Sequence, residues 1–323
     1  MVPIVDLSAS DAPLLIDRAC RDVGFFLLCG HGIARSLRLE MDGVARDFFA
    51  LPTAEKKAIA MANSGRAWRG WFPLEGELTS GVADLKEGFY VGRDLPADHP
   101  SVVAGWPLHG TNVWPSALPE LQRCVEAWMT AVEAVGQQTL AAMAVGLGLS
   151  ADFFRAGLAA DPTALFRIFR YPPHPPGTAG TERWGVGEHS DYGLLTLLAH
   201  DGRPGLEVKR PNETWLPVPA DPELLVCNLG DMLDRLTGGR YRSTPHRVRN
   251  HASGDRLSFP FFLDPSWQAT IDPIELDDEW ETPDDSRRRW DRANLRHVGG
   301  TYGDWLTAKV SKVFPDLAAA AIA

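Results

Sequence analysis

A series of short apolar segments in the second half of this 323-residue chain constrains its fold more than any other feature. Each segment is four to eight residues long and is bounded by Gly, Pro, Asn or Asp, the residues that favour turns. Strands of this length, separated by turn signals, are typical of an antiparallel barrel or a double-sheet roll. The segments cover residues 164–171, 194–199, 206–209, 214–218, 224–228, 246–249 and 257–263.

Helices are predicted mainly outside this series. Apolar residues recur every three or four positions from Pro119 to Leu147, which places them on one face of a long helix that must lie against a sheet. Residues 63–115 are rich in Gly, Pro and Trp and predict loops and short strands. Residues 285–315 predict helix again, with Arg287–Arg289 on a solvated face. Shorter patterns predict strands at 3–7 and 24–29, and helices at 11–20 and 34–50.

The composition indicates a globular chain and excludes several partners. There are 32 Lys and Arg against 42 Asp and Glu, so the net charge of −10 provides no basic field for nucleic acid. The first residues lack the pattern of a signal peptide, and no apolar run is long enough to span a membrane. We therefore expect a cytoplasmic protein that binds neither nucleic acid nor membrane. No repeat or low-complexity linker appears, which favours a single domain over residues 1–323.

Cysteine usage restricts the ligands available to any metal. The four cysteines are scattered and form no Cys-x-x-Cys pair, so small buried side chains in a reducing compartment are the expected state. A metal would then be held by nitrogen and oxygen atoms from the nine histidines and the acidic residues. The cysteines are Cys20, Cys29, Cys124 and Cys227.

Two histidines and one aspartate have the types and positions of a metal site. His189 and Asp191 stand at the mouth of a predicted strand, and residues two apart in an extended segment project to the same side. His246 begins another predicted strand 55 residues after Asp191. Two histidines and one carboxylate on one face of a metal form the facial triad of non-haem Fe(II) oxygenases, which leaves positions open for a co-substrate and O2.

A possible anion site follows on a later strand. Arg256 and Ser258 share one side of an apolar strand by the same two-residue period. A guanidinium in such a strand is costly to bury unless an anion meets it, and it offers a two-pronged donor to a carboxylate. A protein carboxylate could also fill that role. The alternation continues to Phe262, which we expect to face the same pocket and to touch substrate.

With these motifs in place, the chain resembles the isopenicillin N synthase-like branch of the Fe(II)/2-oxoglutarate-dependent dioxygenases. The resemblance covers about residues 3–315. It is carried by residues 187–198 (GEHSDYGLLTLL), 228–231 (NLGD), 241–248 (YRSTPHRV) and 256–258 (RLS), with 3–7 (PIVDL) and 24–33 (GFFLLCGHGI) near the start.

The resemblance implies a fold, a cofactor set and residue roles. The fold would be a distorted double-stranded β-helix, or jelly roll, backed by helices, with a family N-terminal module at 1–115 and the catalytic core at 160–270. Fe(II) would be bound by the triad named above, and O2 and 2-oxoglutarate would be co-substrates. Arg256 and Ser258 would bind the distal carboxylate of 2-oxoglutarate, and Tyr171, in Arg170-Tyr171-Pro172, would add a hydrogen bond, although the usual preceding Asn-Tyr is absent.

The implied reaction decarboxylates 2-oxoglutarate to succinate and CO2 while a small organic molecule is oxidised, most commonly hydroxylated. Desaturation and ring closure remain open, as do two alternative functions. One is an isopenicillin N synthase-type oxidase that draws all its electrons from the substrate, and the other is a catalytically silent binding module. No motif defines the substrate; Phe89 is a candidate for the pocket, although an aromatic side chain in its region is as often packing.

Overall fold

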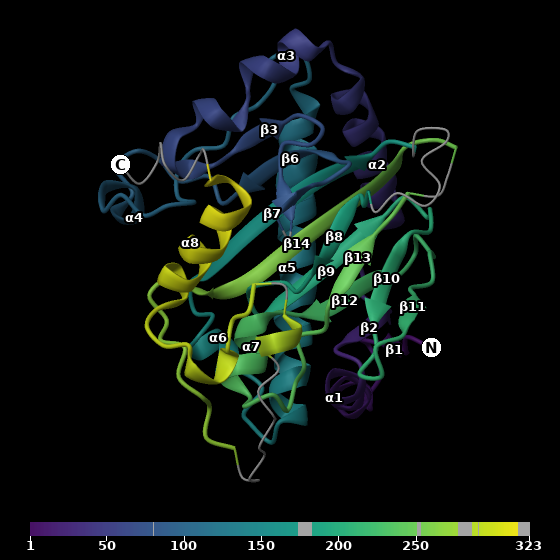
Figure 1. The fold of residues 1–323 in the computed structure, drawn as a ribbon, viewed down its shortest axis with the longest axis vertical. Helices are drawn as coiled ribbons and strands as arrows, with labels where there is room; N and C mark the ends of the chain where they lie inside the picture. The colour runs from purple at the N-terminus through teal and green to yellow at the C-terminus, as the bar shows by residue number, and fades with distance from the viewer. Residues whose placement is uncertain (80, 174–182, 251–252, 277–285, 290, 316–323) are drawn as a thin grey trace.

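The computed structural model describes residues 1–79, 81–173, 183–250, 253–276, 286–289 and 291–315 (Figure 1). The strands are β1 (Ile4–Asp6), β2 (Phe25–Cys29), β3 (Gly70–Phe72), β4 (Leu78–Thr79), β5 (Val82–Ala83), β6 (Glu87–Gly92), β7 (Pro162–Tyr171), β8 (Val186–His189), β9 (Leu195–His200), β10 (Leu206–Lys209), β11 (Trp215–Pro217), β12 (Leu225–Leu229), β13 (His246–Val248) and β14 (Arg256–Ser266). The α-helices are α1 (Ala12–Asp22), α2 (Arg35–Ala50), α3 (Thr53–Ala58), α4 (Pro100–Val103), α5 (Glu120–Gly146), α6 (Phe153–Ala156), α7 (Asp231–Leu236) and α8 (Tyr302–Val313).

Two sheets form the centre of the molecule. The main sheet has the strand order β1-β2-β12-β9-β14-β7-β6-β3, and every neighbouring pair is antiparallel except β1 and β2. The second sheet has the order β11-β10-β13-β8 and is antiparallel throughout. From β7 to β14 the chain passes repeatedly between the two sheets, with β8, the pair β10 and β11, and β13 in the second sheet and the other strands in the main sheet. The prediction of a double-sheet roll with helices around it is therefore confirmed.

Strand β14 shows how the sequence pattern builds this arrangement. Leu257, Phe259, Phe261 and Leu263 are almost fully buried, and Leu263 packs against the long helix α5. A Cβ at Gly136 of α5 would lie 2.7 Å from the Leu263 side chain, so glycine allows the helix to approach the sheet closely. The alternate residues of β14 therefore face the other way, into the space between the sheets.

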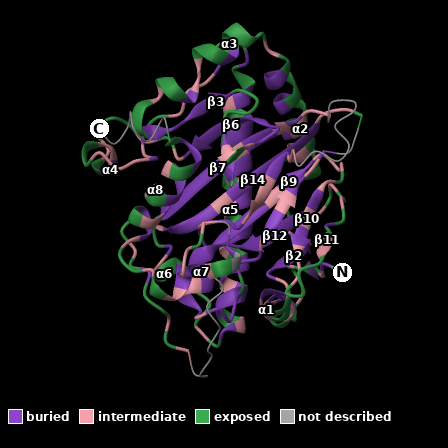
Figure 2. Cartoon of the chain, in the orientation of Figure 1, coloured by how far each residue is buried: buried purple, intermediate pink, exposed green. Residues whose placement is uncertain are grey.

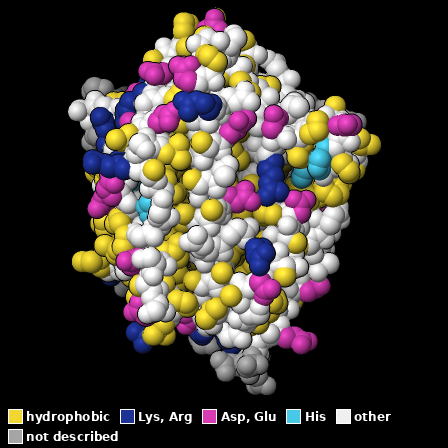
Figure 3. Space-filling view, turned by 180° about the vertical axis from the view of Figure 1, so that it is seen from behind, with side chains coloured by type: hydrophobic (Ala, Val, Ile, Leu, Met, Phe, Trp, Pro, Cys, Tyr) yellow, Lys and Arg dark blue, Asp and Glu magenta, His cyan; other side chains and the backbone are white. Residues whose placement is uncertain are grey.

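Helices cover the two sides of the main sheet (Figure 1). Helix α5 passes behind the sheet and contacts β9 and β14, while α8 lies in front and also contacts β14. Burial follows these layers, since the strands are buried and the exposed positions lie mainly on the outer helices and loops (Figure 2). Seen from the α5 side, acidic and basic side chains are scattered among hydrophobic ones (Figure 3). No helix in the described ranges combines the length and apolar character needed to cross a bilayer.

The structure corrects two local predictions. Among the described residues of 285–315, α-helix is confined to α8, and short 3₁₀ turns occur at Ser286–Arg288 and Leu295–His297. Arg289 is buried rather than solvated, because its guanidinium contacts buried carboxylate and hydroxyl groups. The four-residue strand β8 was not predicted, since its polar sequence Val-Gly-Glu-His lacks an apolar run.

Candidate metal and co-substrate site

Three residues from the second sheet converge on one point between the sheets. His189 ends β8, His246 begins β13, and the two are direct partners in the strand pairing. Asp191 follows β8 by two residues. Its Oδ1 atom lies 3.7 Å from Nε2 of each histidine, and the three ligand atoms all lie within 4.8 Å of one another. These distances leave space for one metal ion contacted by all three side chains.

Backbone carbonyl groups orient both imidazole rings. The Nδ1 atom of His189 lies 2.8 Å from the Gly187 carbonyl oxygen, and that of His246 lies 3.2 Å from the Thr244 carbonyl oxygen. A carbonyl oxygen only accepts hydrogen bonds, so each Nδ1 carries the proton and each Nε2 presents its lone pair towards Asp191. This is the tautomer that a metal-binding histidine requires.

Hydrogen bonds also select which oxygen of Asp191 is free. Its Oδ2 atom accepts hydrogen bonds from Thr196 Oγ1 at 2.5 Å and from Asn228 Nδ2 at 2.6 Å. Thr196 of β9 and Asn228 of β12 are direct strand partners, so the main sheet supplies both donors. Oδ1 is left facing the two histidines. Neither Thr196 nor Asn228 was predicted to act at the site, although both stand in motifs that carry the resemblance.

The protonation states suit a metal site. Burial and the neighbouring His246 lower the pKa of His189 to about 3, so its imidazole is neutral at pH 7. Burial alone would raise the pKa of Asp191, but the two imidazoles and the hydrogen bonds from Thr196 and Asn228 lower it below its usual range. A buried carboxylate beside two imidazoles is a donor set that fits a divalent transition metal.

The predicted anion site lies at one end of the main sheet. Arg256 and Tyr171 are direct partners on β14 and β7, and the guanidinium carbon lies 5.1 Å from the centre of the Tyr171 ring. The Tyr171 hydroxyl lies 3.2 Å from Ser258 Oγ. Arg256 is 1% exposed; its Nε donates to the Arg203 carbonyl, but its buried Nη1 atom has no hydrogen-bond partner among the residues that the structure describes. An unsatisfied guanidinium beside two hydroxyl groups fits a carboxylate ligand.

A cavity between the sheets connects the two groups. Tyr171 lines it, as do all three residues of the triad, whereas Arg256 and Ser258 lie beside Tyr171. Phe262 is also in the wall. The structure does not bring Phe89 to this cavity, because its ring faces the other side of the main sheet and packs against Phe48 and Trp114. Other described lining residues are Phe25, Lys86, Leu165, Arg167, Tyr192 and Asp264.

Two cations in this wall, the buried Lys86 and the half-buried Arg167, were not predicted from the sequence. Lys86 forms ion pairs with Glu77 at 2.8 Å and Asp84 at 2.7 Å. The Arg167 guanidinium stacks 4.7 Å from the centre of the Phe262 ring and lies 3.9 Å from a Glu77 oxygen. Arg167 occurs within the apolar strand β7, so the reasoning that singled out Arg256 would also have found it.

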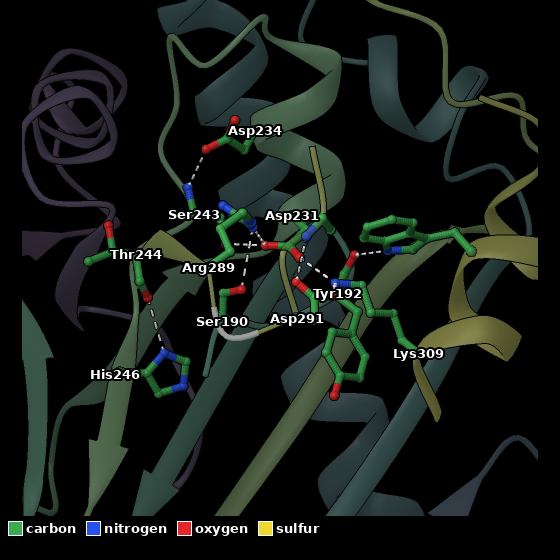
Figure 4. Close-up of polar contacts among 12 residues, drawn as sticks. Ser190, Tyr192, Asp231, Asp234, Ser243, Thr244, His246, Arg289, Asp291 and Lys309 are labelled. Atoms are coloured by element: carbon green, nitrogen blue, oxygen red, sulfur yellow. Dashed lines mark hydrogen bonds and ion pairs between the residues drawn. The ribbon is translucent and has the colours of Figure 1, made fainter. Parts of the chain in front are cut away.

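A buried polar network connects the metal-site loops to the C-terminal helix (Figure 4). Asp231, at the start of α7, accepts a hydrogen bond from Ser243 Oγ at 2.7 Å and pairs with Arg289. Its other oxygen lies 3.3 Å from Nζ of Lys309 in α8. Arg289 also reaches Ser190, which stands between two residues of the triad. The network therefore ties α8 and the 286–289 turn to the loop that carries the triad.

Comparison with known proteins assigns the family. Residues 2–117 match a family model described as the N-terminal region of a non-haem dioxygenase in morphine synthesis, and residues 162–265 match the model of the 2OG-Fe(II) oxygenase superfamily. A relative from Dictyostelium discoideum, named "Probable iron/ascorbate oxidoreductase", is 42% identical and is matched over 94% of this chain and 88% of its own length. The chain belongs to the 2OG-Fe(II) oxygenase superfamily.

Other members of the superfamily agree in sequence and fold. A 2-oxoglutarate-dependent dioxygenase from Aspergillus niger is 35% identical, with 89% of this chain and 88% of that protein covered. The crystal structure of a full-length Neurospora crassa protein in complex with alpha-KG and thymine superposes with a TM-score of 0.78 at 24% identity, covering 98% of this chain and 96% of that one. The chain is thus a 2-oxoglutarate-dependent oxygenase that uses Fe(II) and O2, and the predicted jelly roll is confirmed.

Proposed function

We propose that His189, Asp191 and His246 bind the Fe(II) of this oxygenase. The observation that carries the proposal is that both Nε2 atoms and the free Oδ1 atom face one point, with every other polar atom of the three side chains already hydrogen-bonded. When bound, the iron with 2-oxoglutarate and O2 supplies the oxidising chemistry, which yields succinate and CO2. The chain holds the ligands in position and shields them from water.

The distal carboxylate of 2-oxoglutarate would bind at Arg256, Ser258 and Tyr171. Burial lowers the pKa of Arg256, because Tyr171 and Asp201 only partly offset the lost hydration of its charge. A carboxylate would supply a counter-ion and would accept hydrogen bonds from both hydroxyl groups. Because these groups are on β7 and β14 and the triad is on the opposite sheet, a co-substrate bound between them would be held at both ends.

The substrate would be a small organic molecule that enters the same cavity, and hydroxylation is the expected outcome. Phe262 offers an apolar wall for it. Arg167 lies beside that ring and makes only a 3.9 Å contact with a carboxylate. A substrate with an apolar body and at least one hydrogen-bond acceptor would match this pair. The proposal of a small-molecule substrate is supported by the Neurospora crassa relative, whose crystal structure is a complex with thymine.

The metal and co-substrate assignments are tested together by anaerobic titration of the protein with Fe(II) and 2-oxoglutarate. We expect a visible charge-transfer band in the wild type that disappears in His246→Gln. The control is His31→Gln, since His31 lies near the surface and its Nε2 only meets the Glu223 carbonyl oxygen. A band that persists in His246→Gln, or is absent from well-folded wild type, would contradict the assignment. Succinate formed per turnover across a substrate panel then tests the reaction, and its absence would favour an oxidase that does not consume 2-oxoglutarate.

A further inference from the structure

A second cavity continues along the inner face of the main sheet. The alternation on β7 that places Arg167 and Leu165 in the first cavity also places Thr163 two residues further on the same side. Leu165 lines both cavities, whereas Thr163 and Ser266 line only the second. The second cavity has a volume of about 320 Å³. It contains none of the residues assigned above to iron or 2-oxoglutarate.

A buried arginine in this cavity forms no ion pair within the described part of the chain. Arg69 is 3% exposed, and its Nη2 donates to the Leu108 carbonyl oxygen at 2.6 Å. Its buried Nε has no hydrogen-bond partner, and no carboxylate among the described residues forms an ion pair with it. Burial lowers the pKa of Arg69 to about 10, because the charge of Asp94 only partly offsets the lost hydration of the guanidinium. A buried, partly unsatisfied guanidinium costs stability unless an anion meets it.

The backbone is shaped to accommodate that guanidinium. Gly92 of β6 pairs with Leu165, so its missing side chain would point to the same inner face. A Cβ at Gly92 would collide with the Arg69 guanidinium. The glycine thus leaves the room that Arg69 fills beside the cavity, which argues that the position of the charge is built into the sheet.

The remaining groups of the wall provide a hydrogen-bond donor, and the carboxylate among them, Asp161, pairs with Arg93 and not with Arg69. The Thr163 hydroxyl is buried and has no hydrogen-bond partner. Arg93, at the rim, is already neutralised by Glu133 and Asp161, each at 2.8 Å. The cavity therefore combines a cation that has no ion pair among the described residues with one unused hydroxyl, and both are complementary to an oxyanion.

We propose that the second cavity is a binding site for a small oxyanion, a carboxylate or a phosphate, held by Arg69 and Thr163. Since Leu165 separates the two cavities, the anion has two possible sources. The anion is either the far end of the substrate or a separate small anion that binds independently of the reaction. The first assignment rests on the function proposed above.

Calorimetric titration of the full chain with inorganic phosphate, and separately with acetate, tests the site without turnover. We expect Arg69→Gln to weaken binding at least tenfold. Thr163→Val should weaken it about threefold to tenfold while leaving the fold intact, because it removes a hydroxyl that satisfies nothing. Arg66→Gln is the matched control, since Arg66 is exposed and bonds only the Gly105 carbonyl. Arg256→Gln removes any binding of these anions at the co-substrate site and should leave anion binding in the second cavity unchanged.

The outcomes distinguish the site from the reaction. If neither anion binds the wild type, or if both bind Arg69→Gln as tightly, the proposal is overturned. If phosphate competes with a carboxylate-bearing substrate, and the KM of that substrate rises tenfold in Arg69→Gln, then the substrate is the source of the anion. Phosphate binding that depends on Arg69 but does not compete identifies a separate anion. Binding of this kind alongside an inactive substrate panel would support the site and count against the proposed function.

Discussion

The hydrogen bond from Thr196 to Asp191 gives the sharpest test of the metal site. Thr196→Val keeps the shape of the side chain and removes only the hydroxyl, which donates to Asp191 Oδ2 at 2.5 Å. Thr196 is 3% exposed, so water cannot readily replace the lost donor. Asp191 would then be held by Asn228 alone, at 2.6 Å, and its carboxylate could rotate away from the two histidines.

The expected magnitude follows from two independent estimates. A hydrogen bond to a charged group contributes about 1.5–3 kcal/mol. Loss of a partner that orients a metal ligand reduces metal affinity by about 10- to 100-fold. Because Asn228 still restrains the same oxygen, we expect the lower end, about tenfold weaker binding for Thr196→Val. The double variant Thr196→Val with Asn228→Ala should approach about 100-fold.

Anaerobic calorimetric titration with Fe(II), repeated with Mn(II), measures this effect directly. Thr139→Val is the matched control, since the buried Thr139 hydroxyl bonds the Val135 carbonyl within α5. It should leave metal affinity unchanged. If folded Thr196→Val binds either metal within twofold of the wild type, the hydrogen bond does not orient Asp191 and the reasoning is refuted.

Three further predictions concern co-substrate binding, pH and stability. Arg256→Lys loses the two-pronged donor, so the 2-oxoglutarate concentration that half-saturates the charge-transfer band should rise at least about tenfold. Burial raises the pKa of Asp264 from 3.8 to about 7. The proton on this carboxyl therefore stabilises the folded state fully below pH 4. About 4 kcal/mol of that stability is lost as the pH rises through 7. Asp264→Asn should remove this loss. Urea unfolding of both proteins at pH 4, 5.5, 7 and 8 gives the difference between their free energies of unfolding, and a difference that stays the same at every pH would contradict the prediction. Asp231→Asn weakens the pairs with Arg289 and Lys309, so urea unfolding should show a loss of about 3–5 kcal/mol, and an unchanged midpoint would show that the network does not stabilise the fold.

The strand pattern of the second half was readable from the sequence because each strand carries its own signal. Alternation on β14 predicts that Arg256, Ser258 and Phe262 share one side, and the cavity does lie on that side at Phe262. Strand β8 was not predicted because Val186 is its only apolar residue, so its strand structure depends on pairing with β13. Long-range pairing of this kind leaves no local trace.

The residues that were hardest to predict are those that contact a site residue from a different strand. Thr196 and Asn228 matter to Asp191 only because β9 and β12 pair at that register. Arg289 reads as part of a solvated basic run, yet it is buried against Asp231, whose charge comes from a segment 58 residues away. Phe89 illustrates the reverse error, since an aromatic residue in a short strand gives no indication of which face of the sheet it will occupy.

By itself, the sequence determined the chemistry available to this protein. Two histidines and an aspartate at strand spacing, followed by an Arg-x-Ser pair, predict an iron and a carboxylate site because those residue types have few other uses together in extended segments. Only the tertiary structure decided which oxygen of Asp191 is free, which aromatic ring faces the cavity, and that Arg69 is buried without an ion pair among the described residues. Those properties depend on register and layer packing, which join residues far apart in the chain and are therefore invisible to local pattern.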